Sequence, residues 1–129
     1  MQKRVGLLYL SLDSRRILLI LENEKWTVPT FALQKSVMED SRDLQEKFSQ
    51  GKILPIELYL SKDKGFEYGT YICLVNDEFI TKTVPTFCWC DLNYLPKNVH
   101  VGLRSTLNNN LIRTKIETVL ELNKDVNTI

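Results

Sequence analysis

Apolar and polar positions along the first part of the chain form short blocks separated by polar turns. Residues 4–12 and 16–23 are apolar runs joined by a polar tripeptide, which predicts a β-hairpin. Residues 26–28 continue as a short strand that Pro29 closes, and a loop is expected after it. Further strands are predicted at residues 53–62, 66–75, 79–84 and 86–92.

Helical spacing occurs in three segments. Ser36 followed by Glu39 is a capping-box start, and the stripe of this helix is formed by Val37, Ser41, Leu44 and Phe48. A short helix opens near Val99, and asparagines 108–110 separate it from a last helix at about residues 111–123. One face of the last helix carries Ile112, Ile116, Val119 and Leu120. The order predicts an α+β fold, an α/β/α sandwich with a largely non-parallel sheet.

Length and composition describe an ordinary globular chain. Its 129 residues are 43% hydrophobic and carry a net charge of +1, so we expect one domain over residues 1–129. No overall field attracts nucleic acid, which disfavours that class of partner. The longest apolar run, residues 17–21, is far below the roughly 20 residues of a membrane span. Three cysteines, an odd number, predict a cytoplasmic protein.

The cysteines allow one metal hypothesis. Cys88 and Cys90 lie on a predicted strand with their thiols on one face, and Cys73 and His100 would complete a four-ligand zinc site. The alternative is that these are buried free cysteines, which are common on strands.

The first helix has an acidic stripe opposite its apolar one. Glu39, Asp43, Glu46 and Gln50 follow at spacings of four, three and four residues. Carboxylates so spaced are close enough to share Mg²⁺ and substrate phosphate oxygens. The alternative is a solvated face, on which Asp43 pairs with Lys47 and Arg42 with Glu46.

The order of these segments resembles the Nudix superfamily, whose motif is G-x5-E-x7-R-E-U-x-E-E-x-G-U after a Trp, a hydrophobic residue and a Pro. The pieces that carry the resemblance are RILLILENEKWTVP (16–29), the acidic helix, and FCWCDLNYLP (87–96). NVHVGLRSTL (98–107) is similar to small phage-type members. The resemblance spans most of the chain and implies a Nudix-like mixed sheet flanked by helices.

The catalytic motif matches in part. Aligned by helix phase, Arg42 matches the motif arginine, Asp43 replaces the first glutamate of R-E-U-x-E-E, and Glu46 matches the second. Lys47 replaces the third. In an ungapped alignment from Pro29, Glu46 is the one acidic residue that falls on an acidic position of the motif.

The motif glycines are also replaced. PTF at residues 29–31 stands where the family has Pro-Gly-Gly. Glycine allows backbone conformations that threonine and phenylalanine adopt only at a cost.

The resemblance implies a site for a nucleoside diphosphate linked to another group, such as a nucleotide sugar. Asp43 and Glu46 would hold Mg²⁺ or Mn²⁺, and Glu39 would position or deprotonate water. Arg42 would orient Glu46. The substrate would contact Lys47, Phe31 and His100.

A non-catalytic module that binds a nucleotide or a protein partner is the alternative. Lys47 in place of a carboxylate changes the local charge by two, and each unit at about 4 Å is worth roughly 4 kcal/mol at a dielectric of 20. A structural or inhibitory protein unrelated to nucleotides is a third class. Lysine and asparagine usage fits an AT-rich phage genome and therefore a host cytoplasm.

Other side chains have two interpretations each. Asp77 and Glu78 lie where Nudix proteins place an extra carboxylate, although their segment is also ordinary turn composition. Tyr68 and Tyr94, like Phe31, are candidates for stacking on a base. Trp26 and Trp89 are expected in the core or in a wall of the site.

Overall fold

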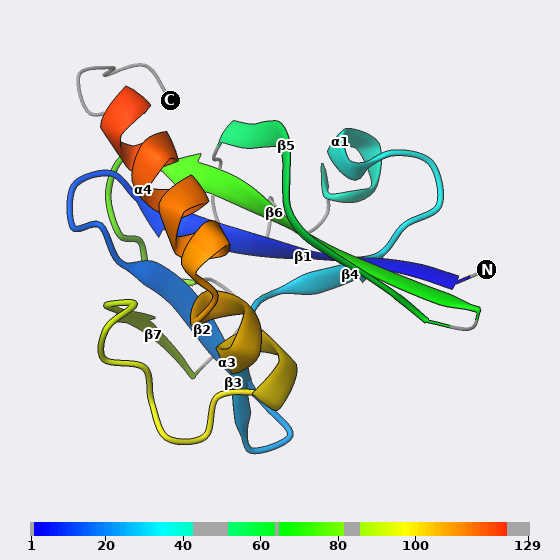
Figure 1. The fold of residues 1–129 in the computed structure, drawn as a ribbon, viewed down its shortest axis with the longest axis horizontal. Coiled ribbons are helices and arrows are strands. Elements are labelled where there is room, and N and C mark those ends of the chain that lie inside the picture. The colour runs from blue at the N-terminus through cyan, green and yellow to red at the C-terminus, as the bar shows by residue number, and fades with distance from the viewer. Residues whose placement is uncertain (1, 43–51, 64, 82–85, 124–129) are drawn as a thin grey trace.

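The computed structural model describes residues 2–42, 52–63, 65–81 and 86–123. Within these ranges, seven strands form one mixed sheet and three helices flank it (Figure 1). The strands are β1 (Gln2–Ser11), β2 (Ile17–Glu22), β3 (Lys25–Thr27), β4 (Thr30–Ala32), β5 (Lys52–Asp63), β6 (Phe66–Val75) and β7 (Phe87–Cys90). The helices are α1 (Val37–Asp40), α3 (Val101–Leu107) and α4 (Asn110–Asn123).

Strand β1 lies at the centre of the sheet, in the order β3-β2-β1-β6-β5. It runs parallel to β6 along its whole length, whereas the other described strand pairs are antiparallel. Its second edge is shared: β4 pairs with the first half, and β2 meets the second half at Leu10↔Ile17. The predicted hairpin of β1 and β2 is therefore present but short.

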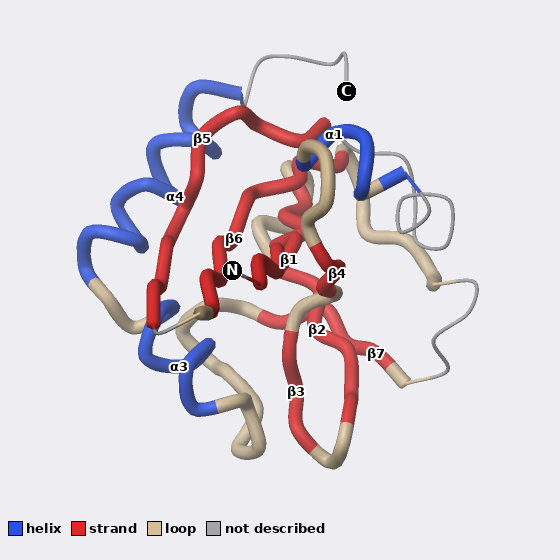
Figure 2. Tube along the Cα trace, turned by 90° about the vertical axis from the view of Figure 1, so that its right-hand side faces the viewer, coloured by secondary structure: helices blue, strands red, loops and turns tan. Residues whose placement is uncertain are grey.

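Side chains alternate between two faces of the central strands. One face supports α3 and α4, and its buried cluster includes Leu8, Leu10, Ile72, Leu74, Leu103, Leu107, Ile112 and Ile116. The other face supports α1, and its cluster includes Val5, Leu7, Tyr9, Leu18, Cys73 and Val75. Figure 2 views the sheet between them, with α3 and α4 on one side and α1 on the other. Both faces of β1 are buried, which explains its continuous apolar run.

The segment after Pro29 is a strand and not the predicted loop. Strand β4 pairs with β1 in the register Val5↔Phe31 and Gly6↔Thr30. Threonine and phenylalanine favour extended backbone, and β1 offers an open edge beyond the end of β2. The pairing is long-range, so the local pattern did not predict it.

The strand predicted at residues 79–84 is wrong for its described part, because Phe79 to Thr81 form no strand. The Phe79 ring makes edge contacts with Tyr9 and Trp89 at centroid distances of 5.6 and 5.3 Å. Its carbonyl accepts a hydrogen bond from Trp89 Nε1 at 3.0 Å. Side-chain packing holds this segment in place of strand pairing.

The predicted helix starts and the last helix are confirmed, but α1 ends at Asp40 with Ser41 as its C-cap, whereas the sequence predicted one helix running on through residue 48. Ser36 caps α1 by accepting from the amide of Glu39 at 3.1 Å, and Ser41 of the predicted stripe is fully buried. Leu44 and Phe48 lie outside the described residues. The predicted apolar face of α4 is buried throughout. In the described part of the chain, no helix is long and apolar enough to span a bilayer.

Candidate functional site

A cavity of about 530 Å³ opens on the face of the sheet that carries α3. It lies between the end of the β5–β6 hairpin, the β2–β3 hairpin and the start of α3. Its walls are formed by Arg4, Glu22, Asn23, Lys25, Thr27, Thr30, Ser61, Phe66, Tyr68, His100, Gly102 and Leu103. Most of these residues are far apart in the sequence, so the cavity exists only in the folded chain.

Arg4 and Tyr68 form a neighbouring pair in the cavity wall, on adjacent parallel strands. The Arg4 guanidinium donates a hydrogen bond to Thr30 Oγ1 at 2.8 Å. Desolvation raises the pKa of Tyr68, although a hydrogen bond with Thr70 and the Arg4 charge act in the opposite direction. The tyrosine is therefore a neutral, half-buried ring beside a fixed cation.

Tyr68 occupies space that Gly6 leaves free. A Cβ atom at Gly6 would lie 2.3 Å from Tyr68 Oη and 2.9 Å from Val28 Cγ2. Both distances are shorter than van der Waals contact. The absence of a side chain at Gly6 therefore allows the tyrosine ring to lie over β1.

His100 is held at the cavity from two directions. Its amide donates to the carbonyl of Trp26 at 2.9 Å, and the Trp26 amide donates to the carbonyl of Asn98 at 2.8 Å. These bonds add residues 98–100 to the edge of β3. The imidazole caps α3, with Nδ1 accepting from the amide of Gly102 at 3.2 Å.

The cavity walls combine positive charge with aromatic rings. Arg4 and Lys25 supply two cationic donors against the one carboxylate of Glu22, while Tyr68 and the 37%-exposed Phe66 supply flat apolar surface. Anionic groups are recognised by cationic donors, and planar rings stack on aromatic side chains. The chemistry suits a ligand with both a negatively charged part and a flat part.

The structure describes only the first part of the predicted acidic helix. Glu39 is an exposed residue of α1, and Arg42 is exposed just after it. Asp43, Glu46 and Lys47 lie outside the described residues. Their roles therefore stay predictions from the sequence.

The structure does not bring two of the predicted substrate residues together. His100 lines the cavity on the α3 face, whereas Phe31 packs against the buried cluster on the α1 face. Its neighbour Thr30 points into the cavity wall and contacts Arg4. Alternation along β4 separates them, and sequence reasoning missed Arg4 and Thr30 because it did not predict β4.

Another residue that sequence reasoning missed is Asp40. Its carboxylate accepts hydrogen bonds from the amides of Gln34 and Lys35 at 2.6 and 2.8 Å. These bonds hold the chain just before α1. The signal available was an acidic residue in the first turn of a capped helix.

The zinc hypothesis is wrong. Cys88 and Cys90 share one face of β7, as predicted, but Cys73 is buried in the cluster on the opposite face of the sheet. Desolvation raises the pKa of Cys73 to about 12, so its thiol keeps its proton. Within the described ranges, no three His, Cys, Asp or Glu side chains gather to hold a metal.

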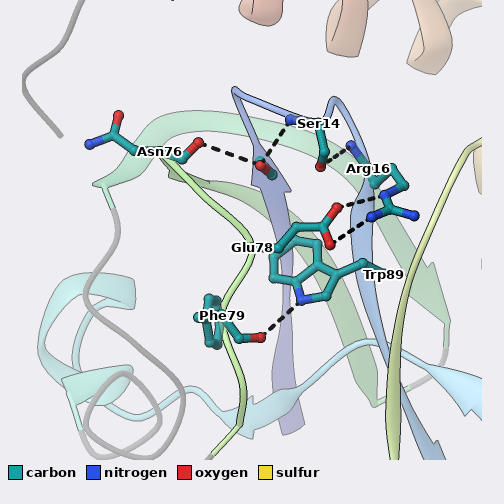
Figure 3. Close-up of polar contacts among 7 residues, drawn as sticks. Ser14, Arg16, Asn76, Glu78, Phe79 and Trp89 are labelled. Carbon is teal, nitrogen blue, oxygen red and sulfur yellow. Dashed lines mark hydrogen bonds and ion pairs between the residues drawn. The ribbon is translucent and has the colours of Figure 1, made fainter.

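Glu78 is engaged in a structural ion pair (Figure 3). Its two carboxylate oxygens accept from Arg16 at 2.6 and 2.8 Å. Desolvation would raise the pKa of Glu78, but hydrogen bonds from Ser14 and Arg16 and the Arg16 charge hold it below the usual value. The side chain therefore links the β1–β2 turn to the segment after β6.

Comparison with solved structures identifies the fold. No family model and no curated protein matches the sequence. The structure is similar to the Nudix hydrolase RenU from M. smegmatis, with 14% identity, a TM-score of 0.68 and coverage of 98% of this chain and 90% of RenU. It is also similar to a C. elegans Ap4A hydrolase, with 16% identity, a TM-score of 0.63 and coverage of 92% and 99%.

A third similar structure is the C-terminal domain of mouse MUTYH in complex with human PCNA. The identity is 11%, the TM-score is 0.59, and the match covers 92% of this chain and 90% of that domain. The mixed seven-stranded sheet with helices on both faces is thus the Nudix fold, as the resemblance predicted.

Proposed function

We propose that the protein binds a nucleotide derivative, a nucleoside diphosphate linked to another group, in the cavity beside His100, and that the acidic helix after α1 forms a separate site that hydrolyses such derivatives slowly. The observation that carries the proposal is the cavity itself. Arg4 and Lys25 would contact phosphate oxygens, and Tyr68 would face the base. The Nudix fold of the chain supports the same class of substrate.

The hydrolytic part of the proposal rests on residue types in the acidic helix. Mg²⁺ or Mn²⁺ held by Asp43 and Glu46 would neutralise phosphate charge and orient the attacking water. Glu39 would accept a proton from that water, and its exposed position on α1 leaves its carboxylate accessible. Arg42 would orient Glu46 through a charged hydrogen bond.

Lys47 is the reason for expecting slow hydrolysis. An ammonium where the motif has a carboxylate weakens metal affinity, because the metal gains its affinity from several negative ligands. The same ammonium would contact a phosphate oxygen directly as a point charge.

A phosphate-release assay tests the enzyme. The purified chain would be incubated with a panel of nucleoside diphosphate sugars, dinucleoside polyphosphates and ADP-ribose, with Mg²⁺ or Mn²⁺ and a phosphatase to release the product phosphate. We expect slow, metal-dependent turnover that Asp43→Ala and Glu46→Ala each reduce at least about a hundredfold. Asp13→Ala, which removes an exposed acid from a turn, is the control and should keep full activity.

A non-catalytic binding module is the second candidate. It is favoured by β4, in which Thr30 and Phe31 form a paired strand where the motif has two glycines. The likeness to a MUTYH domain in complex with PCNA supports a protein partner as its ligand. Thermal stabilisation by a nucleotide without any turnover would favour a nucleotide-binding module, and failure of every compound to stabilise the chain would favour a protein partner.

A further inference from the structure

The position of the proton on His100 follows from its role as a helix cap. The amide of Gly102 donates a hydrogen bond to His100 Nδ1. A nitrogen that accepts a hydrogen bond has a lone pair and no proton. A neutral imidazole has one N–H, so this contact is compatible with the neutral form of the ring that has its proton on Nε2.

Gly102 allows the ring to take this position. A Cβ atom at residue 102 would lie 3.3 Å from His100 Cε1 and 3.4 Å from Nδ1, closer than most such contacts. The ring therefore folds back over the first turn of α3 against a residue without a side chain. Both residues line the cavity.

We propose that His100 serves the cavity as a hydrogen-bond donor of fixed tautomer, and that Gly102 is its positioning residue. The Nε2–H group would donate to an oxygen acceptor of the bound ligand, either a phosphate oxygen or a carbonyl oxygen of a base. This inference rests on the proposed function, because it names the group in the cavity that recognises the nucleotide derivative. Arg4 and Lys25 in the same walls favour a ligand rich in acceptor oxygens.

A role limited to capping explains His100 less well. Histidine is not among the preferred N-cap residues, which are Ser, Thr, Asp and Asn. The next helix of this chain uses such a residue: Asn109 Oδ1 accepts from the amides of Leu111 and Ile112 at 2.9 and 3.3 Å. A histidine cap differs from an asparagine cap in its second nitrogen, which is a donor on the far side of the ring.

The variant His100→Asn separates the two roles. Asparagine keeps an acceptor for the Gly102 amide but has no group at the place of Nε2. We expect its Tm to equal that of the wild type, while its affinity for the bound nucleotide derivative falls roughly tenfold, the usual effect of losing one hydrogen bond to a charged or polar partner. Affinity would be measured by calorimetry without metal. Equal affinities of the two proteins would overturn the inference.

Two further variants complete the set. Asn109→Ala removes a cap from α4, and it should lower Tm without changing affinity. Gly102→Ala should lower affinity, because the added methyl group displaces the His100 ring, although alanine favours the helix. An unchanged affinity for Gly102→Ala would show that the ring position is irrelevant to binding.

Three probes identify the source of the acceptor oxygen. GDP-mannose has phosphates and a base carbonyl, ADP-ribose has phosphates and a base without a carbonyl, and inorganic pyrophosphate has phosphates alone. Weaker binding of all three to His100→Asn would assign the contact to phosphate. Weaker binding of GDP-mannose alone would assign it to the carbonyl. Equal binding of each probe to the wild type and to His100→Asn would overturn the inference.

Nitrogen NMR gives a readout that needs no activity. His100 is the one histidine of the sequence, so its ring resonances need no assignment. We expect the Nε2–H tautomer in the free protein and a shift of the Nε2 resonance when a probe binds. Observation of the Nδ1–H tautomer would overturn this inference and leave the proposed function standing. Absence of binding and turnover with every compound would instead refute the proposed function as well.

Discussion

At the scale of single residues, Tyr68 can take its place in the cavity wall because Gly6 has no side chain. Gly6 lies on the central strand, and Tyr68 and Val28 fill the space above it. The position of Tyr68 in the cavity wall is therefore sensitive to one methyl group at residue 6. A glycine in an apolar run carries no sign of this in the sequence, because the contact partner is more than sixty residues away.

Gly6→Ala tests this contact. We expect the free energy of unfolding to fall by about 1–3 kcal/mol, the usual cost of overpacking, because Tyr68 and Val28 must both move. Denaturant unfolding measures it. Combination with Tyr68→Phe, which removes the oxygen that would lie nearest, should recover part of the loss. An alanine variant as stable as the wild type would contradict the close contact.

At the scale of elements, the β2–β3 hairpin has an unfavourable turn. Glu22 pairs with Lys25, so the turn consists of Asn23 and Glu24, with φ angles of 50° and 64°. Two-residue hairpin turns of this kind favour Asn-Gly. Asparagine tolerates positive φ, but glutamate in that region is strained. The polar composition of residues 22–25 predicted a turn without revealing its conformation.

Glu24→Gly should therefore stabilise the protein. Relief of the left-handed backbone strain at residue 24 should raise the free energy of unfolding by about 1 kcal/mol. Part of this gain is offset because glycine has more conformational freedom in the unfolded chain. Thermal or denaturant unfolding measures the gain. Asn23→Gly is the matched control and should produce a smaller change, because asparagine already suits its position. Equal effects at the two positions would argue against strain at Glu24.

Pairing between elements explains which predictions succeeded. The helix at residues 111–123 was predicted with its complete buried face because a helical stripe is a local pattern. The caps at Ser36 and the break at asparagines 108–110 are local as well. Strand β4 was missed because only its pairing with β1 makes it a strand.

At the scale of the whole molecule, the sheet separates two groups of residues. The cavity lies on the face that carries α3, and α1, which leads into the acidic segment, packs on the opposite face. Figure 2 shows this division of the helices between the two sides. Binding in the cavity and hydrolysis by the acidic helix should therefore respond to different substitutions.

Binding without metal tests this separation. Arg4→Met should weaken the binding of ADP-ribose about tenfold or more, because it removes a charged donor from the cavity. Lys3→Met is the matched control: it removes a neighbouring charge that pairs with Glu67 at 3.5 Å, on the opposite face of β1. Asp43→Ala and Glu46→Ala should bind as the wild type does. Loss of metal-free binding in these acidic-helix variants would contradict the separation.

The sequence by itself determined the class of fold, most strands and the buried face of the last helix, because these depend on periodic patterns within about twenty neighbouring residues. It also placed His100 and Tyr68 among the candidates for the site. Tertiary structure alone decided that both line one cavity with Arg4, and that Phe31 lies on the other face. It also removed the zinc hypothesis by placing Cys73 across the sheet from Cys88. The physical reason is that strand pairing and alternation join distant residues, and no local pattern records which strands pair.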